Sequence, residues 1–326
     1  MKISIVIPVY NAEYFILKAV ESAIQQPEVA EIILVEDSSF DNSLGVCKEI
    51  EKKYKKVRLL QHKDKKNHGA GASRNLGINK AKYNYIGFLD ADDFYLKNRF
   101  KVSKNIFKSS NNIDGVYEAV GTNFYNKNSQ IKWLFSNLKK LTTLNEKIDP
   151  KQLSKTLIKG KKGSLHLDGI VVKKSLILKS GMFNEKLIMH QDSDLIIKMS
   201  VIGKLVPGNL KDPVAIRNIH DNNRILKIND INNSKFLMWQ SLAYWWHENK
   251  LKKISFILIL KNYFYYAILL AFKKNGNFNI KKNKIRLLIS ELIKFHVQSL
   301  ISLILILFSV LNYQKKIIKK KYEIRG

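Results

Sequence analysis

NHGAGASRNLGINKAKYNYIGFLDADD, residues 67–93, is the stretch that decides the fold. It combines a glycine-rich turn, a helical pattern over 71–81 and a short apolar run over 85–89 that ends in a cluster of acidic residues. A helix followed by a short apolar run is typical of an α/β domain, in which a buried parallel strand follows its helix. The stretch therefore predicts an α/β fold with polar, ligand-binding groups just after the strand.

The same alternation of strands and helices continues toward the N-terminus. Apolar runs predict strands over 3–9, 31–35 and 57–61, and helical patterns over 11–26 and 41–54 separate them. This order predicts a mostly parallel sheet flanked by helices. Ligands bind beyond the carboxyl ends of the strands in such sheets, so the four loops there are the candidate site. They read PVYNAE, EDSSFDNS, HKDKKNHGAGASRN and DADD.

Three carboxylates crowd the turn that follows the strand over 85–89. Asp90, Asp92 and Asp93 would repel one another unless a cation joins them. Hard divalent ions such as Mg²⁺ and Mn²⁺ prefer carboxylate oxygens and are often completed by the phosphates of a substrate. The cluster therefore indicates a site for a divalent metal and a diphosphate. The alternative is a solvated acidic turn or a helix N-cap.

Two other positions at the same edge of the predicted sheet suit a nucleotide. Asp37 ends the second strand in LVEDSS, where a carboxylate can accept hydrogen bonds from a ribose or a base. Arg74 follows the glycines of GAGASRN at the start of a helix, a natural place to hold phosphate or ribose. The alternatives are that Asp37 caps the helix expected near Asp41 and that the glycines only form a turn.

Together, PVYNAE, EDSSFDNS and the stretch over 67–93 closely resemble the family 2 inverting glycosyltransferases with the A-type fold. The resemblance is strong over about the first 100 residues and continues to about residue 225. It implies a Rossmann-like, mostly parallel sheet flanked by helices. It also implies an enzyme that transfers a hexosyl or N-acetylhexosaminyl group from a nucleotide-diphosphate sugar, UDP-linked by family preference, with Mn²⁺ or Mg²⁺ as cofactor.

The resemblance also assigns roles to single residues. In the first two loops it implies a nucleobase and ribose pocket formed by Pro8, Tyr10, Glu13 and Asp37, and it adds Gly69, Arg74, Asp90 and Ala91 to the donor-binding residues. It implies that Asp92 holds the metal that bridges the donor diphosphate.

A later motif, MHQDSDLIIKM, resembles the family segment that carries the general base. Asp192 matches the base, which removes the proton of the acceptor hydroxyl while the sugar is displaced with inversion. Gln191 stands where the family usually has a glutamate, so a supporting carboxylate is missing here. Asp194 is the alternative base, and helix capping is the alternative role for both aspartates.

Two histidines complete the candidate site. His220, in IRNIHDNNRI, matches a family loop that approaches the diphosphate or the metal, and we expect it to bind the metal. Without the resemblance it would be a histidine of a surface loop. His166, which opens HLDGIVV with Asp168, is expected to face the acceptor.

Composition bounds the partners and the compartment. The 57 Lys+Arg exceed the 27 Asp+Glu and give a formal net charge of +30, which implies a polyanion or an anionic surface as partner. The alternative is an AT-rich coding bias toward Lys, Asn and Ile. Cys47 is the one cysteine, so no intrachain disulfide can form and a reducing compartment fits. The N-terminus reads as a strand and not as a signal peptide, so we expect a cytoplasmic chain.

The C-terminal part has a different character. Between Trp245 and Gly326 there are seventeen Lys/Arg and three Asp/Glu among aliphatic and aromatic runs. The uncharged run Phe295–Tyr313 is long enough to cross a membrane, but a single crossing would translocate the basic tail against the positive-inside tendency. We therefore expect helices that lie on the inner face of the cell membrane. The alternatives are a membrane span, a soluble helical cap and a dimerisation surface.

The chain is thus expected to comprise a catalytic domain over 1–225, with a donor-binding half over 1–100 and an acceptor half over 101–225, and a helical extension over 226–326. The expected acceptor is a lipid-linked or surface glycan. A sugar nucleotidylyltransferase is disfavoured because PVYNAE contains no glycine. A nucleic-acid-binding protein is disfavoured because the basic residues accompany aliphatic runs and no recognised module is present. A catalytically silent scaffold is the remaining alternative.

Overall fold

The computed structural model describes residues 1–127, 130, 131, 133, 140–220, 230–249, 251 and 253–272. The chain divides into two compact units, Met1–Asn229 and Asp230–Gly326. The functions assigned to the parts 1–100, 101–225 and 226–326 stay predictions.

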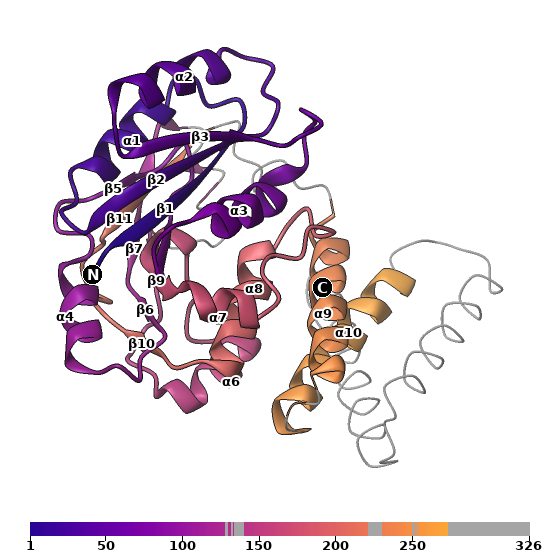
Figure 1. The fold of residues 1–326 in the computed structure, drawn as a ribbon. Coiled ribbons are helices and arrows are strands. Elements are labelled where there is room, and N and C mark those ends of the chain that lie inside the picture. Colours follow the sequence, from indigo (N-terminus) through magenta and orange to yellow (C-terminus); the bar gives the residue numbers. More distant parts are fainter. Residues whose placement is uncertain are drawn as a thin grey trace. The chain divides into compact units, whose positions relative to one another are not determined.

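The first unit is built on a sheet of seven strands in the order β10-β6-β9-β4-β1-β2-β3 (Figure 1). The strands are β1 (Ile3–Val9), β2 (Val29–Glu36), β3 (Val57–Gln61), β4 (Tyr85–Phe88), β6 (Gly115–Tyr117), β9 (Ile170–Lys173) and β10 (Leu205–Pro207). All neighbours pair in parallel except β9, which runs antiparallel to both β4 and β6. The predicted mostly parallel α/β sheet is confirmed.

Helices cover both faces of this sheet and bury its central strands, whereas the edge strands β3 and β10 are partly exposed. On one face lie α1 (Ile16–Ile24), α2 (Ser43–Lys53) and α4 (Lys101–Ser109); on the other lie α3 (Gly69–Lys80), α6 (Pro150–Lys159), α7 (Lys174–Lys179) and α8 (Gln191–Ile202). Successive side chains of a strand point to opposite faces, so Ile5 and Ile7 pack with α1 while Val6 packs with α3. This two-sided burial explains why these strands read as continuous apolar runs.

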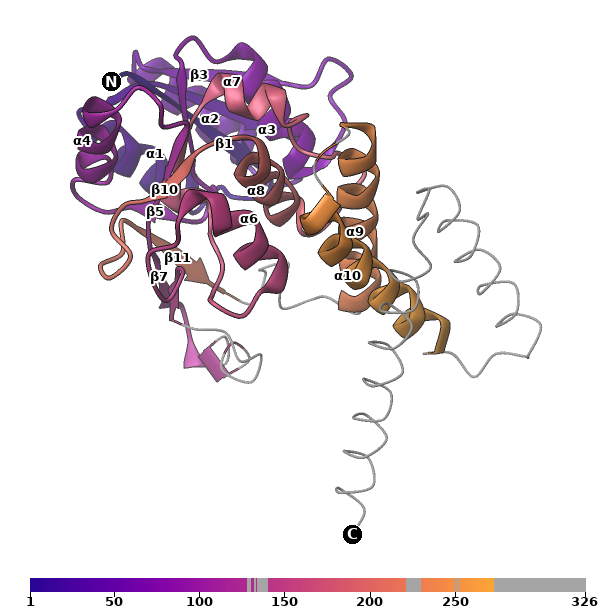
Figure 2. The same cartoon turned by 90° about the horizontal axis from the view of Figure 1, so that it is seen from below.

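A second, smaller sheet was not predicted from the sequence. It has the order β5-β11-β7-β8, with β5 (Phe94–Tyr95), β7 (Val120–Phe124), β8 (Leu141–Thr142) and β11 (Ala215–Ile219). Figure 2 shows β7 and β11 side by side, and they pair in parallel. Two of its strands have only two residues, and the other two, VGTNF and AIRNI, contain polar residues, so none reads as an apolar run. This sheet matters for function because β5 directly follows the acidic turn and β11 ends just before His220.

The second unit contributes two described helices, α9 (Ile231–Glu248) and α10 (Lys253–Phe272), which pack on each other. Phe236 of α9 stacks on Tyr263 of α10 with ring centroids 5.2 Å apart, and Trp239, Leu242 and Trp246 are buried. The predicted helical extension is therefore confirmed for these residues. Neither α9 nor α10 nor any other helix in the described ranges is both long and apolar enough to cross a membrane. The run Phe295–Tyr313 lies outside the described residues.

Candidate functional site

The loops after β1 and β2 are fastened to each other. The backbone N–H of Ala12 donates to Ser43 Oγ at 2.8 Å, and the N–H of Asn42 donates to the carboxylate of Glu13 at 2.8 Å. Because these residues bond across to the second loop, α1 begins at Ile16 and not at the predicted position 11. Glu13 therefore joins the two loops of the expected base pocket, and its role toward a nucleobase stays a prediction.

Two aromatic rings are presented by these joined loops. Tyr10 follows β1 and is partly exposed, and its ring meets that of Phe40 edge-to-face at 6.1 Å. Pro8, which was also assigned to the base pocket, is half-buried in β1. The edge of the sheet thus offers an aromatic surface at the place where the sequence predicts a base to bind.

Asp37 fixes the glycine-rich loop before α3. Its two carboxylate oxygens accept the backbone N–H groups of His68 and Gly69 at 2.8 and 2.7 Å, and Gly69 adopts a φ of 84° that favours glycine. At the start of α2, whose N-cap residue is Asn42, the N–H of Ser43 donates to the carboxylate of Asp41 at 3.0 Å and not to Asp37. Asp37 therefore ties the second strand to α3, and its contact with a donor stays a prediction.

Arg74 and Asp90 form an ion pair across two elements. Nη2 of Arg74, from the second turn of α3, lies 2.6 Å from Oδ1 of Asp90, two residues after the end of β4, and the guanidinium lies over the ring of Phe183. Burial alone would raise the pKa of Asp90, but the charge and hydrogen bond of Arg74 hold this pKa below its ordinary value. Asp90 is therefore ionised. Its neighbour Ala91 is buried.

Asp92 meets His220 although the two residues are far apart in sequence. Oδ2 of Asp92 and Nε2 of His220 are 3.0 Å apart, and both side chains stay partly exposed, at 27% and 17%. Asn218 of β11 secures this contact because its Nδ2 donates to the backbone carbonyl of Asp92 at 2.5 Å. The structure thus brings together the two residues that the sequence assigns to the metal.

Asp93 lies in a very different environment. It is buried, and its Oδ1 accepts the backbone N–H of Asn218 at 2.8 Å. Burial, followed by the charges of Asp92, Asp168 and Asp90, raises the pKa of Asp93 well above its ordinary value. A protonated Asp93 can donate a hydrogen bond to the carboxylate of Asp168. Its burial and its bond to Asn218 make Asp93 a structural member of the acidic turn.

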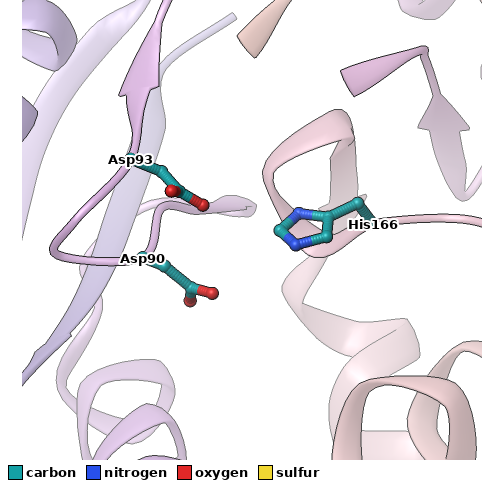
Figure 3. A group of neighbouring side chains, drawn as sticks. All are labelled: Asp90, Asp93 and His166. Atoms are coloured by element: carbon teal, nitrogen blue, oxygen red, sulfur yellow. The ribbon is translucent and has the colours of Figure 1, made fainter. Parts of the chain in front are cut away.

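His166 lies beside the acidic turn. Asp90, Asp93 and His166 point toward one another (Figure 3), and their possible ligand atoms lie within 4.8 Å of one another. His166 Nδ1 lies 3.5 Å from Asp168, whose Oδ1 accepts the backbone N–H of Asp90 at 3.2 Å. Burial raises the pKa of Asp168 to about 6. Whether His166 also faces the acceptor stays a prediction.

Two sets of residues could therefore hold a cation. In the set of Asp90, Asp93 and His166, the charge of Asp90 is already compensated by Arg74, and one oxygen of Asp93 is committed to Asn218. A nearby guanidinium also repels a cation. The pair of Asp92 and His220 is partly exposed, so it suits an ion that must also reach a substrate.

The start of α8 distinguishes the two candidate bases. Asp192, in the first turn, is half-buried, and its Oδ1 accepts the N–H of Ser193 at 2.8 Å. Asp194 is fully buried and pairs with Lys198 Nζ at 2.6 Å. Gln191 packs against α3, where a Cβ at Gly71 would come within 2.6 Å of its Nε2. Asp192 is therefore the more accessible carboxylate, and it lies next to the contact between α8 and α3.

Sequence reasoning missed Asn218, which bonds to both Asp92 and Asp93. The one available signal was its position two residues before His220, but the strand that carries Asn218 was not predicted. It also left Asp168 without a role, although the sequence placed it beside His166.

Comparison with known families and proteins gives a consistent result. Residues 4–159 match the family described as Glycosyl transferase family 2. An uncharacterized glycosyltransferase of Rickettsia felis is 28% identical over 260 residues, which are 78% of this chain and 40% of that protein. The poly(ribitol-phosphate) beta-glucosyltransferase of Bacillus spizizenii is 44% identical over 97 residues, 29% of this chain and 15% of that protein. The chain thus spans less than half the length of these relatives.

Solved structures show the same fold. Residues 1–349 of S. aureus TarS superpose with a TM-score of 0.62 at 16% identity, covering 90% of this chain and 81% of the other. The structure of the same TarS residues in complex with UDP-GlcNAc has a TM-score of 0.62 at 16% identity and covers 82% and 73% of the two chains. This likeness confirms the predicted fold class.

Proposed function

This chain belongs to the family 2 glycosyltransferases, and from that premise we propose that it transfers a sugar from a UDP-linked donor to a surface-glycan or lipid-linked acceptor. The observation that carries the proposal is the convergence of the Arg74–Asp90 and Asp92–His220 pairs on one acidic turn at the carboxyl edge of the sheet. Such an edge is where nucleotides bind in α/β sheets.

The donor would bind along the loops after the parallel strands. Tyr10 offers a ring face for the base, and Arg74 is already held in place by Asp90 to meet a phosphate or a ribose. The choice of a UDP-linked sugar is supported by TarS, whose residues 1–349 have been solved in complex with UDP and with UDP-GlcNAc.

Asp92 and His220 would hold the divalent metal. Adjacent ligands of an octahedral ion, each about 2.1 Å from it, are about 3 Å apart, and the two ligand atoms here are 3.0 Å apart. The carboxylate suits either Mn²⁺ or Mg²⁺, with a diphosphate completing the coordination, and the imidazole favours the transition metal Mn²⁺ over Mg²⁺, which prefers oxygen ligands. A metal bound there would neutralise the charge that develops on the departing diphosphate.

Asp192 would act as general base. It takes the proton of the acceptor hydroxyl while that oxygen forms its bond to the anomeric carbon, and the bond from this carbon to the diphosphate oxygen breaks with its electron pair. Attack from the face opposite the leaving group inverts the anomeric centre. The burial of Asp194 against Lys198 supports the choice of Asp192.

The acceptor would be a polymer of the cell surface. Similar proteins include the minor teichoic acid biosynthesis protein GgaB of Bacillus subtilis and the poly(ribitol-phosphate) beta-glucosyltransferase of Bacillus spizizenii. The formal charge of +30 suits an anionic acceptor and an anionic membrane surface.

The experiment that tests the activity is release of UDP from a panel of UDP-sugars with Mn²⁺ and a membrane lipid extract. Asp92→Ala and Asp192→Ala should each lower turnover at least about 100-fold. Asp212→Ala, at an exposed aspartate of the same unit, is the matched control and should leave turnover unchanged. No UDP release from any donor by the unaltered chain would favour the catalytically silent scaffold.

We further propose that the basic extension holds the chain at the inner face of the cell membrane, with a homodimer as the alternative. The full chain should sediment with vesicles that contain phosphatidylglycerol, and about 0.5 M salt should release it because exposed charges are screened. Equal binding to vesicles of phosphatidylcholine alone would contradict an electrostatic attachment.

A further inference from the structure

We infer that Phe15 is a positioning residue for His220, and that it holds the imidazole of this histidine toward Asp92. The inference rests on the proposed metal-binding role of Asp92 and His220. It assigns a function to a residue that lies outside every motif discussed so far.

The contact that carries the inference is a parallel ring stack. The ring of Phe15 lies 5.0 Å from that of His220, centroid to centroid, with an angle of 16° between the planes. The same imidazole also contacts Asp92, since Nε2 of His220 lies 3.0 Å from Oδ2 of Asp92. Phe15 therefore fixes the plane of the imidazole, and the edge of the ring that carries Nε2 contacts the carboxylate of Asp92.

Tyr125 adds a second ring to this arrangement. It meets Phe15 at 5.6 Å and 84°, and His220 at 6.3 Å and 79°, so it stands edge-on to both stacked rings. Its backbone N–H donates to the carbonyl of Ile219 at 3.0 Å, which fastens it to the end of β11. Edge-to-face and offset-stacked rings are both favourable arrangements of aromatic pairs.

Phe15 itself is well anchored. Its backbone N–H donates to the carbonyl of Ala12 at 2.9 Å, and the N–H of Ala12 donates to Ser43 Oγ at 2.8 Å. The ring therefore stands on the joined loops after β1 and β2, whereas His220 follows a strand of the second sheet. The stack links the expected donor pocket to the expected metal site.

A flat neighbour matters because the terminal torsion of histidine is soft. Rotation about the bond between Cβ and the ring is broad in energy, so an imidazole without neighbours samples many orientations. A ring stacked on its face restricts the imidazole to one plane, and the contact with Asp92 selects, of the two flips in that plane, the one that points Nε2 at the carboxylate. Groups that orient a metal ligand typically change metal affinity about 10- to 100-fold when they are removed.

The test is a titration of the full chain with Mn²⁺ at a fixed concentration of UDP, with free Mn²⁺ followed by electron paramagnetic resonance and a protein-free titration subtracted. Phe15→Leu keeps apolar volume but removes the flat face, and it should weaken Mn²⁺ binding about 10-fold. Phe15→Tyr keeps the face and should restore binding to within about 2-fold of the unaltered chain. Tyr14→Leu, at the neighbouring aromatic residue that is 86% exposed, is the matched control.

The outcomes separate the two proposals. If Phe15→Leu binds Mn²⁺ as tightly as the unaltered chain, the inference is wrong while the metal site stands. Equal weakening by Phe15→Leu and Phe15→Tyr would also overturn it, because the flat face would then not be the cause. If Asp92→Ala binds Mn²⁺ as tightly as the unaltered chain, the proposed metal site is wrong and this inference with it.

Discussion

The acidic turn after β4 has an open rim, formed by Asp92 and His220, and a buried floor, formed by Asp93 and Asp168. Asp92 and Asp93 are consecutive, yet the side chain of Asp92 is 27% exposed whereas Asp93 is 3% exposed. The rim presents charge to a ligand, and the floor uses its carboxylates to accept hydrogen bonds from backbone N–H groups. Adjacent residues of the same type can therefore serve binding and architecture separately.

The floor continues into a buried ion pair. Arg99 and Glu118 are both fully buried with Nη1 and Oε2 3.0 Å apart, and Arg99 Nε donates to the backbone carbonyl of Asp168 at 2.9 Å. Ser103 also donates to the same oxygen of Glu118. The geometry of the floor therefore depends on charges that have no access to water.

The largest expected effect comes from breaking this ion pair. Arg99→Met should lower the free energy of unfolding by about 3–5 kcal/mol, because it leaves the carboxylate of Glu118 buried and unpaired. The rim counterpart, Asp92→Asn, should change this free energy by less than about 0.5 kcal/mol, since the side chain is partly exposed. Urea unfolding followed by far-UV circular dichroism measures both.

Lys162→Met is the matched control, since it removes one partner of the exposed ion pair with Glu146 and should have little effect on stability. If Asp92→Asn destabilises the chain as much as Arg99→Met does, the distinction between rim and floor is wrong.

The sequence predicted the regular part of the fold well because its strands form short apolar runs, and β1 and β2 are almost completely buried. The run over 57–61 and the run ending near Leu89 are β3 and β4 almost as predicted, and Asp37 and Asp90 lie at the predicted edge. These features are local, since each depends on an apolar run and the polar residue that follows it.

The rest of the site depends on contacts between distant segments. His220 was assigned through the family resemblance, and its contact with Asp92 joins residues 128 positions apart. The burial of Asp93 could not be predicted because it follows from the second sheet, whose strands β5 and β11 meet only in the folded chain. The stack of Phe15 on His220 likewise joins residues that are distant in sequence and meet only in the folded chain.

A smaller effect should appear in the pH dependence of stability. Burial raises the pKa of Asp168 from 3.8 to about 6, so the folded chain binds this proton more tightly than the unfolded chain does. The stabilisation from Asp168 is therefore complete below the unfolded value and is lost as pH rises toward about 6, by on the order of 3 kcal/mol. The asparagine of Asp168→Asn does not titrate, so the stability of this variant relative to the unaltered chain should improve as pH rises from about 4 to about 6.

Asp90 provides the opposite case, because Arg74 lowers the pKa of Asp90. The stabilisation that the ionised Asp90 contributes to the folded chain is lost only as pH falls through that lowered pKa. Asp90 is ionised in both states between about pH 5 and pH 7, so its own titration adds no pH dependence there. Asp90→Asn removes one of the charges that raise the pKa of Asp168, so its stability relative to the unaltered chain should improve over this range, but by less than that of Asp168→Asn. Urea unfolding at several pH values gives both profiles. If the difference in unfolding free energy between Asp168→Asn and the unaltered chain does not change with pH, water or a cation reaches the floor. The floor and the rim would then differ only in how strongly they are exposed.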